Sequence, residues 1–215
     1  HRGPFRFSRG DGGGFTSTRG AGGIVSALTP LLTRHEVEAT WFAAAMSPAD
    51  TDAHAAGAAT GLGIDLELIH LDPAAHRMHY DTVSNGALWF LFHGMFDHIR
   101  RPRFDLRFRE AWDAYVEVNH AFASAVAAGA PGGDVVLVQD YQLALVPALL
   151  RTQRPDLRIA HFMHTPFCDA QDARMLPTDI GEQLLGALAS GSEGFHTTRW
   201  ARSYERSARE ILGSR

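Results

Sequence analysis

The sequence contains a single cysteine, Cys168, so no disulfide can form within the chain. One thiol and no disulfide framework is the pattern typical of a reducing compartment, and we expect a cytoplasmic protein. Long apolar runs are also missing, since none reaches the roughly 18 residues that a membrane-spanning helix needs. The sequence therefore predicts neither a disulfide-stabilised scaffold nor a membrane partner.

Positive charge is not in excess either. The formal net charge is -4 and the pI is about 6.3, so no nucleic-acid partner is expected. With 45% hydrophobic residues, a chain of 215 residues is long enough to bury one sizeable core. The expected partners are small molecules, and a homo-oligomer is compatible with this composition.

Neither of the two common glycine motifs for phosphate binding is present. Residues 10–23 contain seven glycines, but they lack the spacing of a dinucleotide site and the Lys-Ser/Thr of a P-loop. The stretch runs into a helical pattern at 24–32, and helix N-terminal amides favour anions. Residues 10–23 are thus expected to be a loop rather than a strand, either a phosphate-binding one or a flexible surface segment.

The chain alternates between patterns typical of strands and of helices. Two short buried strands, at 135–138 and 158–163, flank a helical pattern at 142–152, which is a βαβ unit and requires parallel strands. The same alternation elsewhere predicts an α/β fold with a parallel sheet and no internal domain boundary. Further strands are expected at 40–46 and 64–71, and further helices at 49–61, 84–96, 110–129, 179–188 (opened by an Asp179–Glu182 capping box) and about 200–211.

Two polar residues follow the strands of the βαβ unit. Asp140 and His164 each come after a strand, and ligands of parallel sheets bind at that edge. The alternatives are that Asp140 caps the next helix and that His164 is a hydrogen-bonded core histidine.

His164 also lies near Cys168, but a nucleophilic thiol would need an orienting partner, and an inert cysteine is the simpler interpretation. No metal site is expected, because His161 and His164 should point to opposite faces of the sheet.

Six segments resemble one family in order and spacing, the trehalose-6-phosphate synthases, and are most similar to actinobacterial members. They are HRGP (1–4), GAGGIVSALTPLL (20–32), YDTVSNGALWFLFH (80–93), FREAWDAYVEVNHAFA (108–123), VVLVQDYQLALVPALLR (135–151) and HFMHTPFC (161–168). The resemblance covers essentially the whole chain. It implies that 1–215 is the N-terminal, acceptor-binding Rossmann-like domain of a two-domain enzyme, with helices on both faces of its sheet. The first strand and the C-terminal donor-binding domain would be missing.

The resemblance also implies an activity. Family members transfer glucose from a nucleoside diphosphate glucose to glucose 6-phosphate, with retention of anomeric configuration, and give α,α-trehalose 6-phosphate. The donor could be UDP-, GDP- or ADP-glucose, and no cofactor or metal is implied. The departing diphosphate takes the acceptor proton, so no carboxylate nucleophile is assigned. This chain alone would be inactive, because the family holds the diphosphate with an arginine and a lysine from the second domain.

Carried over by motif, the resemblance assigns the site residue by residue. The implied catalytic residues are Asp140 and His164. The implied glucose 6-phosphate residues are Arg2, Trp41, Tyr80, Trp89 and Asp140. The implied donor residues are Gly22, Gly23 and His164.

The sequence departs from the family pattern beside these positions. QDYQ stands where the family has H-D-Y-H, HTPFC where it has H-I-P-F-P, and His1 where it has asparagine. Two other functions therefore stay open. One is a related synthase with a different acceptor, making glucosylglycerol phosphate or coupling a cyclitol. The other is a non-catalytic relative that binds a sugar phosphate.

Overall fold

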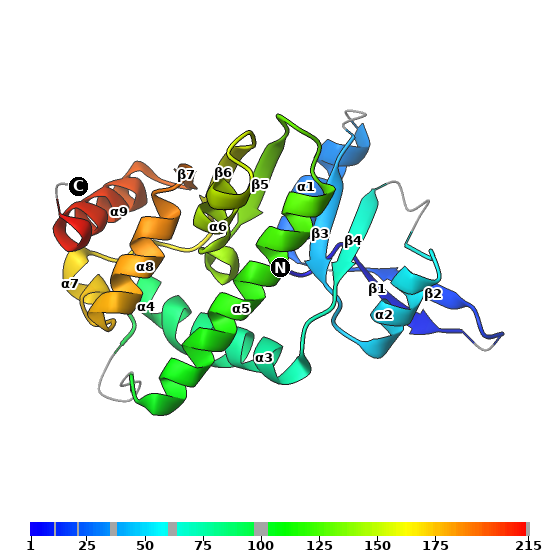
Figure 1. Cartoon of the computed structure of the whole chain (residues 1–215), viewed down its shortest axis with the longest axis horizontal. Helices are drawn as coiled ribbons and strands as arrows, with labels where there is room; N and C mark the ends of the chain where they lie inside the picture. Colours follow the sequence, from blue (N-terminus) through cyan, green and yellow to red (C-terminus); the bar gives the residue numbers. More distant parts are fainter. Residues whose placement is uncertain (11, 21, 35–37, 60–63, 97–102, 214–215) are drawn as a thin grey trace. The chain divides into compact units, whose positions relative to one another are not determined.

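The computed structural model describes residues 1–213 except 11, 21, 35–37, 60–63 and 97–102. The chain divides into two compact units, His1–Leu71 and Asp72–Arg215, and each is described by itself. Figure 1 shows the helices and strands of both units. No helix in the described part of the chain is long and apolar enough to cross a membrane.

The first unit is built on the two parallel strands that the sequence predicts. β3 (Thr40–Ala44) pairs with β4 (Asp65–Ile69), and α2 (Pro48–Ala55) lies between them in the chain. The expected helix after the glycine-rich stretch is α1 (Gly23–Arg34), which continues through Pro30. Alternate strand residues face a small core, which contains Phe7, Ala43, Ala53, Ala59, Leu66 and Leu68.

An antiparallel hairpin precedes α1, and here the expectation of a loop was wrong. β1 (Phe5–Arg9) pairs along its whole length with β2 (Phe15–Arg19). The glycines before β2 form the turn, where Gly13 has a φ of 80° that suits glycine. The alternating β-branched residues of FTSTR then continue as a strand, which the glycine count had obscured.

The second unit contains a three-stranded parallel sheet. Its strands are β5 (Val135–Gln139), β6 (Arg158–Met163) and β7 (Ser192–Phe195), in that order across the sheet. The crossover between β5 and β6 includes α6 (Val146–Gln153), which confirms the βαβ unit. β7 was not predicted, because SEGF is short and carries a charge.

The chain reaches β7 through α7 (Ala170–Ala173) and α8 (Thr178–Leu188), and it continues into α9 (Thr198–Leu212). The helix expected at 179–188 is confirmed, but its capping box is wrong. Pro177 stands at the N-cap of α8 and offers no side-chain acceptor, while the Asp179 carboxylate accepts a hydrogen bond from Arg109.

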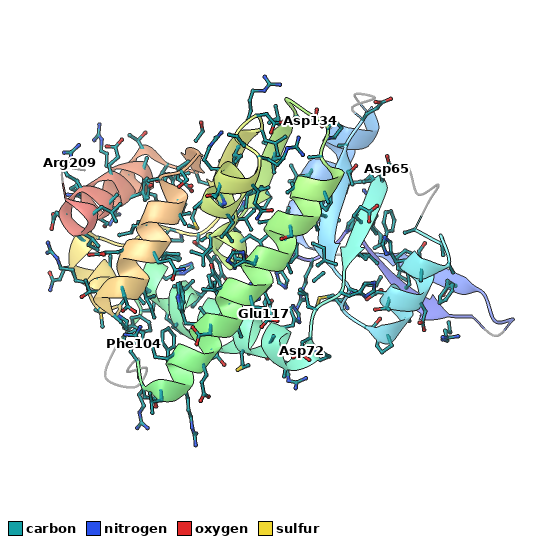
Figure 2. The ribbon with its side chains drawn as sticks, in the orientation of Figure 1. Asp65, Asp72, Phe104, Glu117, Asp134 and Arg209 are labelled. Carbon is teal, nitrogen blue, oxygen red and sulfur yellow. The ribbon has the colours of Figure 1, made fainter. Side chains whose placement is uncertain are left out.

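The helical segment expected at 84–96 begins earlier and is mostly not α-helical. It starts at Asp72, labelled in Figure 2, whose Oδ1 accepts hydrogen bonds from the amides of Ala74 and Ala75. The consecutive segments are α3 (Pro73–Arg77), a π-helix η1 (Met78–Leu88) and α4 (Trp89–Phe92). π-Helices are rare, and their usual form, a single-turn bulge within an α-helix, is frequent at functional sites.

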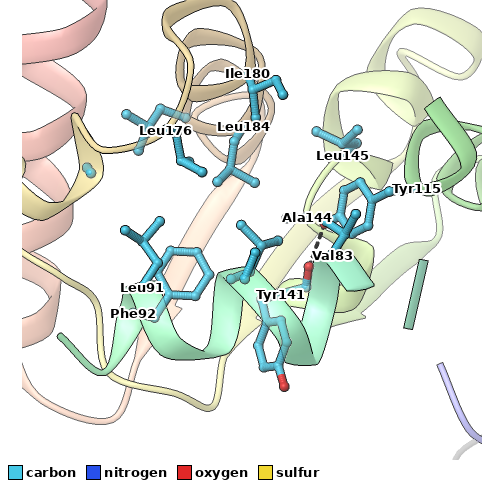
Figure 3. Packing of buried hydrophobic residues seen from close by; sticks show 14 of the residues in the cluster. Val83, Leu91, Phe92, Tyr115, Tyr141, Ala144, Leu145, Leu176, Ile180 and Leu184 are labelled. Carbon is cyan, nitrogen blue, oxygen red and sulfur yellow. Dashed lines mark hydrogen bonds between the residues drawn. The ribbon is translucent and has the colours of Figure 1, made fainter. Parts of the chain in front are cut away.

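The core of this unit gathers around the long helix α5 (Leu106–Gly129). Asp105 caps α5, four to five residues before the expected start at 110, and its Oδ1 accepts from the amide of Phe108. Figure 3 shows part of the core. Its largest fully buried side chains include Leu88, Leu91, Phe92, Tyr115, Met163, Ile180, Leu184, Leu185 and Leu188. Each such residue stabilises the fold by about 1.5–3 kcal/mol.

Candidate active site

Asp140 and His164 meet at the carboxyl edge of the sheet. Asp140 directly follows β5 and His164 directly follows β6, and the two strands are parallel neighbours. The amide of Asp140 donates to the carbonyl oxygen of Phe162 (2.8 Å), and the amide of His164 donates to Oδ1 of Asp140 (3.2 Å). The structure thus brings together the two strand-end residues that the sequence singled out.

The backbone of Asp140 is in an unusual conformation. With φ at 68° and ψ at 170°, it is the one non-glycine residue with a positive φ among those described. That region is essentially restricted to glycine, so keeping an aspartate there costs about 1–3 kcal/mol. The alternative of a helix cap is wrong, because the side chain makes no capping hydrogen bond to the short helix η2 (Tyr141–Leu143). Such strain is typical of functional positions.

Buried side chains hold the turn that follows β5. Three consecutive carbonyl oxygens accept hydrogen bonds from them. His161 donates through Nε2 to the Asp140 oxygen (3.0 Å), and Tyr115 donates to the Tyr141 oxygen (2.5 Å), as drawn in Figure 3. The Gln142 oxygen accepts from His79 Nε2 (2.8 Å) and Asn119 Nδ2 (3.2 Å).

These donors come from β6, α5 and η1, so the turn is fixed from three elements at once. Each donor needs a partner because a buried polar group without one is costly. Burial also lowers the pKa of His79 to about 4, although its bond to the Gln142 oxygen works in the opposite direction. Burial likewise raises the pKa of the Tyr115 hydroxyl. Both groups are therefore neutral donors near pH 7.

The imidazole of His164 is held in one tautomer. Its Nε2 lies 2.8 Å from Oε1 of Gln139, and the Gln139 amide nitrogen donates to the Val138 oxygen (3.2 Å). The second bond sets the orientation of the amide, so Nε2 of His164 carries the proton and Nδ1 is the acceptor nitrogen. Burial lowers the pKa of this histidine, and the nearby Asp140 carboxylate partly offsets the shift. At neutral pH His164 is an uncharged ring.

The predicted aromatic residues of the acceptor site lie on the segment that begins with the π-helix. Tyr80 is on η1, half-buried, and its ring stacks on His76 with 6.1 Å between centroids. Trp89 is the first residue of α4 and stacks on His93 at 4.1 Å. The same segment contacts the turn after β5, because Tyr141 Oη donates to Oδ1 of Asn85 (3.0 Å).

The remaining predicted residues belong to the first unit. Arg2 is exposed and forms a parallel bridge with Ala44, the buried last residue of β3. Trp41 is on β3 and packs against the core while staying partly exposed. Gly22 and Gly23 are exposed at the start of α1, and the Gly22 oxygen accepts from the amide of Ser26. The structure places these four residues within their own unit.

Neither a reactive thiol nor a cluster of metal ligands is found in the described residues. Cys168 is buried, and desolvation raises the pKa of its thiol to about 12, so it is protonated and inert at neutral pH. No group of three or more His, Cys, Asp or Glu side chains in the described ranges is placed to hold a metal ion.

Three side chains that support this edge, Gln139, His161 and Glu193, are not among the predicted site residues. Gln139 holds the ring of His164, and His161 holds the carbonyl of Asp140. Glu193 holds His161 in turn, through hydrogen bonds at 2.8 and 3.0 Å. In the sequence, Gln139 and His161 are polar residues in largely apolar strands, a pattern that usually marks a specific partner. Glu193 lies in the short segment SEGF and has no such signal.

Parallel strands with polar residues fixed at their carboxyl edge define an α/β protein built to bind a small polar ligand. The comparisons make this class specific. The glycosyltransferase family 20 model matches residues 2–215. The chain is 40% identical over 199 residues to the trehalose-6-phosphate synthase of Mycolicibacterium gilvum and 37% identical over 206 residues to that of Mycobacterium tuberculosis. The chain belongs to glycosyltransferase family 20.

These matches cover 91% and 94% of the chain but only 38% and 39% of the relatives, so the chain spans about two fifths of their length. Solved structures agree on the fold. An α,α-trehalose-phosphate synthase (UDP-forming) from Burkholderia vietnamiensis superposes with a TM-score of 0.72 at 23% identity, covering 91% of this chain and 42% of that one. The N-terminal domain of a Candida albicans trehalose-6-phosphate phosphatase gives 0.72 at 22% identity, covering 85% and 39%. The Rossmann-like parallel α/β architecture is thereby confirmed.

Proposed function

We propose that this chain is the acceptor-binding part of a retaining glycosyltransferase that moves glucose from a nucleoside diphosphate glucose to glucose 6-phosphate. The product would be α,α-trehalose 6-phosphate. The observation that carries the proposal is the strained Asp140 beside His164, in a chain that matches glycosyltransferase family 20 from residue 2 to 215. Names of relatives support the same reaction, since those at 37–40% identity are trehalose-6-phosphate synthases.

In this proposal the second unit recognises the acceptor sugar. The Asp140 carboxylate accepts hydrogen bonds from acceptor hydroxyls. The bond from the His164 amide to one of its oxygens orients it for this role. Tyr80 and Trp89 supply flat apolar walls for the sugar ring. His164, with Nε2 bound to Gln139, offers Nδ1 as an acceptor to a hydroxyl of the donor glucose. A neutral acceptor suits a hydroxyl, which can donate to it.

The first unit would meet the phosphates. Arg2, exposed at the end of β3, would pair with the phosphate of glucose 6-phosphate through its planar guanidinium, and Trp41 would lie beside the acceptor. Gly22 and Gly23 would let the donor diphosphate approach the backbone at the start of α1, where amides favour anions. No metal and no cofactor is part of this proposal.

The reaction that fits is a front-face displacement. The bond from the anomeric carbon to the diphosphate oxygen breaks, and a bond to the acceptor hydroxyl oxygen forms on the same face. The acceptor proton passes to the departing diphosphate, so no side chain need act as nucleophile. Catalysis then rests on positioning and on stabilising the leaving group.

The test uses the full-length product of the gene that carries this chain. It is incubated with UDP-, GDP- or ADP-glucose and with glucose 6-phosphate, and the product is identified by mass spectrometry and by its anomeric proton couplings. We expect a disaccharide phosphate with both anomeric centres α. Turnover with glycerol 3-phosphate or a cyclitol phosphate instead would contradict the acceptor assignment. Binding of glucose 6-phosphate without turnover of any donor would favour a non-catalytic protein.

A further inference from the structure

A buried ion-pairing couple lies behind the strained aspartate. His161 on β6 and Glu193 on β7 are directly opposite each other in the parallel register, and their side chains are 0% and 6% exposed. Nδ1 of His161 lies 2.8 Å from Oε1 and 3.0 Å from Oε2 of Glu193. The other ring nitrogen, Nε2, lies 3.0 Å from the carbonyl oxygen of Asp140.

The positions of the protons on His161 and Glu193 show which groups donate hydrogen bonds and which accept them. A carbonyl oxygen only accepts, so Nε2 of His161 must carry a proton. One further proton lies between Nδ1 and the Glu193 carboxyl group, whichever of the two holds it. In both arrangements the ring is anchored by two oxygens of one residue, and its Nε2–H points at Asp140. Glu193 therefore fixes the orientation of the donor that Asp140 receives.

Such a buried pair adds little to the free energy of unfolding. Taking two ionisable groups out of water usually cancels most of the gain from pairing them, and an apolar pair of similar volume often serves as well. A carboxyl group bonded to one ring nitrogen instead fixes the tautomer and the direction of a histidine. Here the direction leads to a single backbone position, and that position has the unfavourable φ.

Every polar group of Asp140 makes a hydrogen bond within the protein, and the carbonyl is the group that His161 binds. Its amide is bound to the Phe162 oxygen, and its carboxylate is bound to the amide of His164. The carbonyl also accepts from the amide of Leu143 (3.1 Å), so a rotation of this peptide plane would break that bond and the bond to His161 together. The conformation of Asp140 is set by this plane together with the preceding one, whose amide is held by Phe162, so Asp140 cannot relax to an ordinary pair of φ and ψ while both planes stay anchored.

We propose that His161 and Glu193 are positioning residues that hold Asp140 in its strained backbone conformation, so that its carboxylate meets the hydroxyls of a sugar-phosphate acceptor. The proposal rests on the proposed function of Asp140. It assigns no contact with substrate to either residue. It also explains why two ionisable side chains face each other across the sheet while both are buried.

The test uses variants of the full-length gene product. His161→Phe removes both nitrogens and keeps a flat ring, and Glu193→Ala removes the anchor. Glu193→Gln keeps a group that can donate to Nδ1, so it should rescue the ring orientation. Ser207→Ala is the matched control, because it deletes another buried side-chain hydrogen bond to a carbonyl, that of Cys168, away from the turn.

We expect His161→Phe and Glu193→Ala to lower kcat/KM for glucose 6-phosphate about tenfold or more, as is common when partners in one network are coupled. Glu193→Gln should lose less than about threefold on the same reasoning, and the KM for the donor should not change. In an Asp140→Ala background, His161→Phe should have no further kinetic effect. Equal losses in both backgrounds, or a kinetic loss in Ser207→Ala as large as in His161→Phe, would overturn the proposal.

A second measurement does not depend on turnover. Hydrogen exchange by mass spectrometry reports the amides of Asp140 and Leu143, and we expect faster exchange in peptides covering 140–145 of His161→Phe but not of Ser207→Ala. Unchanged exchange there would overturn the positioning role. A wild-type protein without glucosyl transfer would overturn the proposed function alone, and the exchange result would still decide whether His161 holds Asp140.

Discussion

The backbone amide of His164 donates a hydrogen bond to the side chain of Asp140, across two parallel strands that end side by side. This bond joins the residue after β5 to the residue after β6, and it uses one carboxylate oxygen. The carboxylate is thus oriented by the protein before any ligand arrives. Preorganisation of this kind lowers the free-energy cost of binding, since the carboxylate loses little rotational freedom when the ligand binds.

Removing the Asp140 carboxylate should weaken the use of the acceptor and leave the binding of the nucleotide unchanged. In the full-length protein, Asp140→Ala is expected to lower kcat/KM for glucose 6-phosphate by roughly ten- to a hundredfold, because a hydrogen bond to a charged group is worth about 1.5–3 kcal/mol. The affinity for the nucleoside diphosphate alone should barely change. Acceptor kinetics together with nucleotide titration measure both, and an equal loss in the two would contradict the assignment.

Comparing Asp140→Gly with Asp140→Ala separates the effect of backbone strain on stability from the effect of the carboxylate on acceptor binding. Both Gly and Ala lose the carboxylate, but only glycine adopts a φ of 68° without cost. Asp140→Gly should therefore be more stable than Asp140→Ala by about 1 kcal/mol, while both bind the acceptor poorly. Urea titrations of the two variants give this difference. If Asp140→Ala proved the more stable one, the turn would not be strained in solution.

Part of this site was predictable because parallel sheets obey simple rules. The bounds of β6 agree with the expected 158–163, and the residue after a buried strand lies at the carboxyl edge. Asp140 and His164 could thus be paired from spacing alone. The contacts of Gln139, His161 and Glu193 could not, because they depend on the cross-strand register and, for Glu193, on a strand that the sequence did not predict.

The surroundings of Tyr80 could not be predicted for a different reason. Hydrophobic periodicity distinguishes a 3.6-residue repeat from a two-residue repeat, and a wider π-helix fits neither template. The start of the segment was also missed, although Asp72 followed by Pro73 is a typical helix opening. The hairpin at 5–19 was missed because its glycine-rich turn resembled a loop.

The 215-residue chain by itself should not transfer glucose. It spans about two fifths of the length of its relatives, and the family resemblance assigns part of the donor site to the remainder. We expect no trehalose 6-phosphate from the purified chain with any of UDP-, GDP- or ADP-glucose, measured by mass spectrometry over hours. The full-length gene product is the positive control. Turnover by the shorter chain would show that transfer does not need the part of the relatives that this chain does not span.

Acid should destabilise the second unit through His79. The pKa of this buried histidine is about 4 when folded and 6.5 without its surroundings, so between these values the unfolded chain binds a proton that the folded chain does not. Stability is thus fully present above pH 6.5 and falls toward pH 4, by about 3 kcal/mol in all. His79→Gln keeps an N–H donor and should flatten this part of the curve. His120→Gln, at an exposed site on α5, should not.

The urea-induced unfolding free energy measured from pH 7 to pH 4 tests this assignment. Carboxylates with lowered pKa values, such as Asp156, titrate mainly at the acid end of the range and so contribute little near pH 6. A wild-type curve that stays flat from pH 6.5 to 5 would contradict the burial of a neutral His79. Equal flattening in the His79 and His120 variants would assign the effect to general charge.

Gly86 should be essential for the π-helix that carries Tyr80. A Cβ atom at this position would lie 2.7 Å from the carbonyl oxygen of Asp81, a distance that requires the backbone to move. Gly86→Ala is therefore expected to destabilise the fold by about 1–3 kcal/mol, as overpacking usually does. Gly186→Ala is the matched control, because that helical glycine in α8 has no atom within 4 Å of the added Cβ. There alanine should stabilise by about 0.5–1 kcal/mol.

The two alanine variants should also differ in function. If the helix relieves the clash by shifting its register at 78–88, Tyr80 and Trp89 turn relative to each other, so the KM for glucose 6-phosphate should rise in Gly86→Ala and stay unchanged in Gly186→Ala. Unfolding free energies from urea titrations and acceptor kinetics of the folded fraction provide both readouts. A Gly86→Ala protein as stable and as active as the Gly186→Ala protein would mean that the segment is an ordinary α-helix in solution, and that the approach of Gly86 to Asp81 does not place Tyr80.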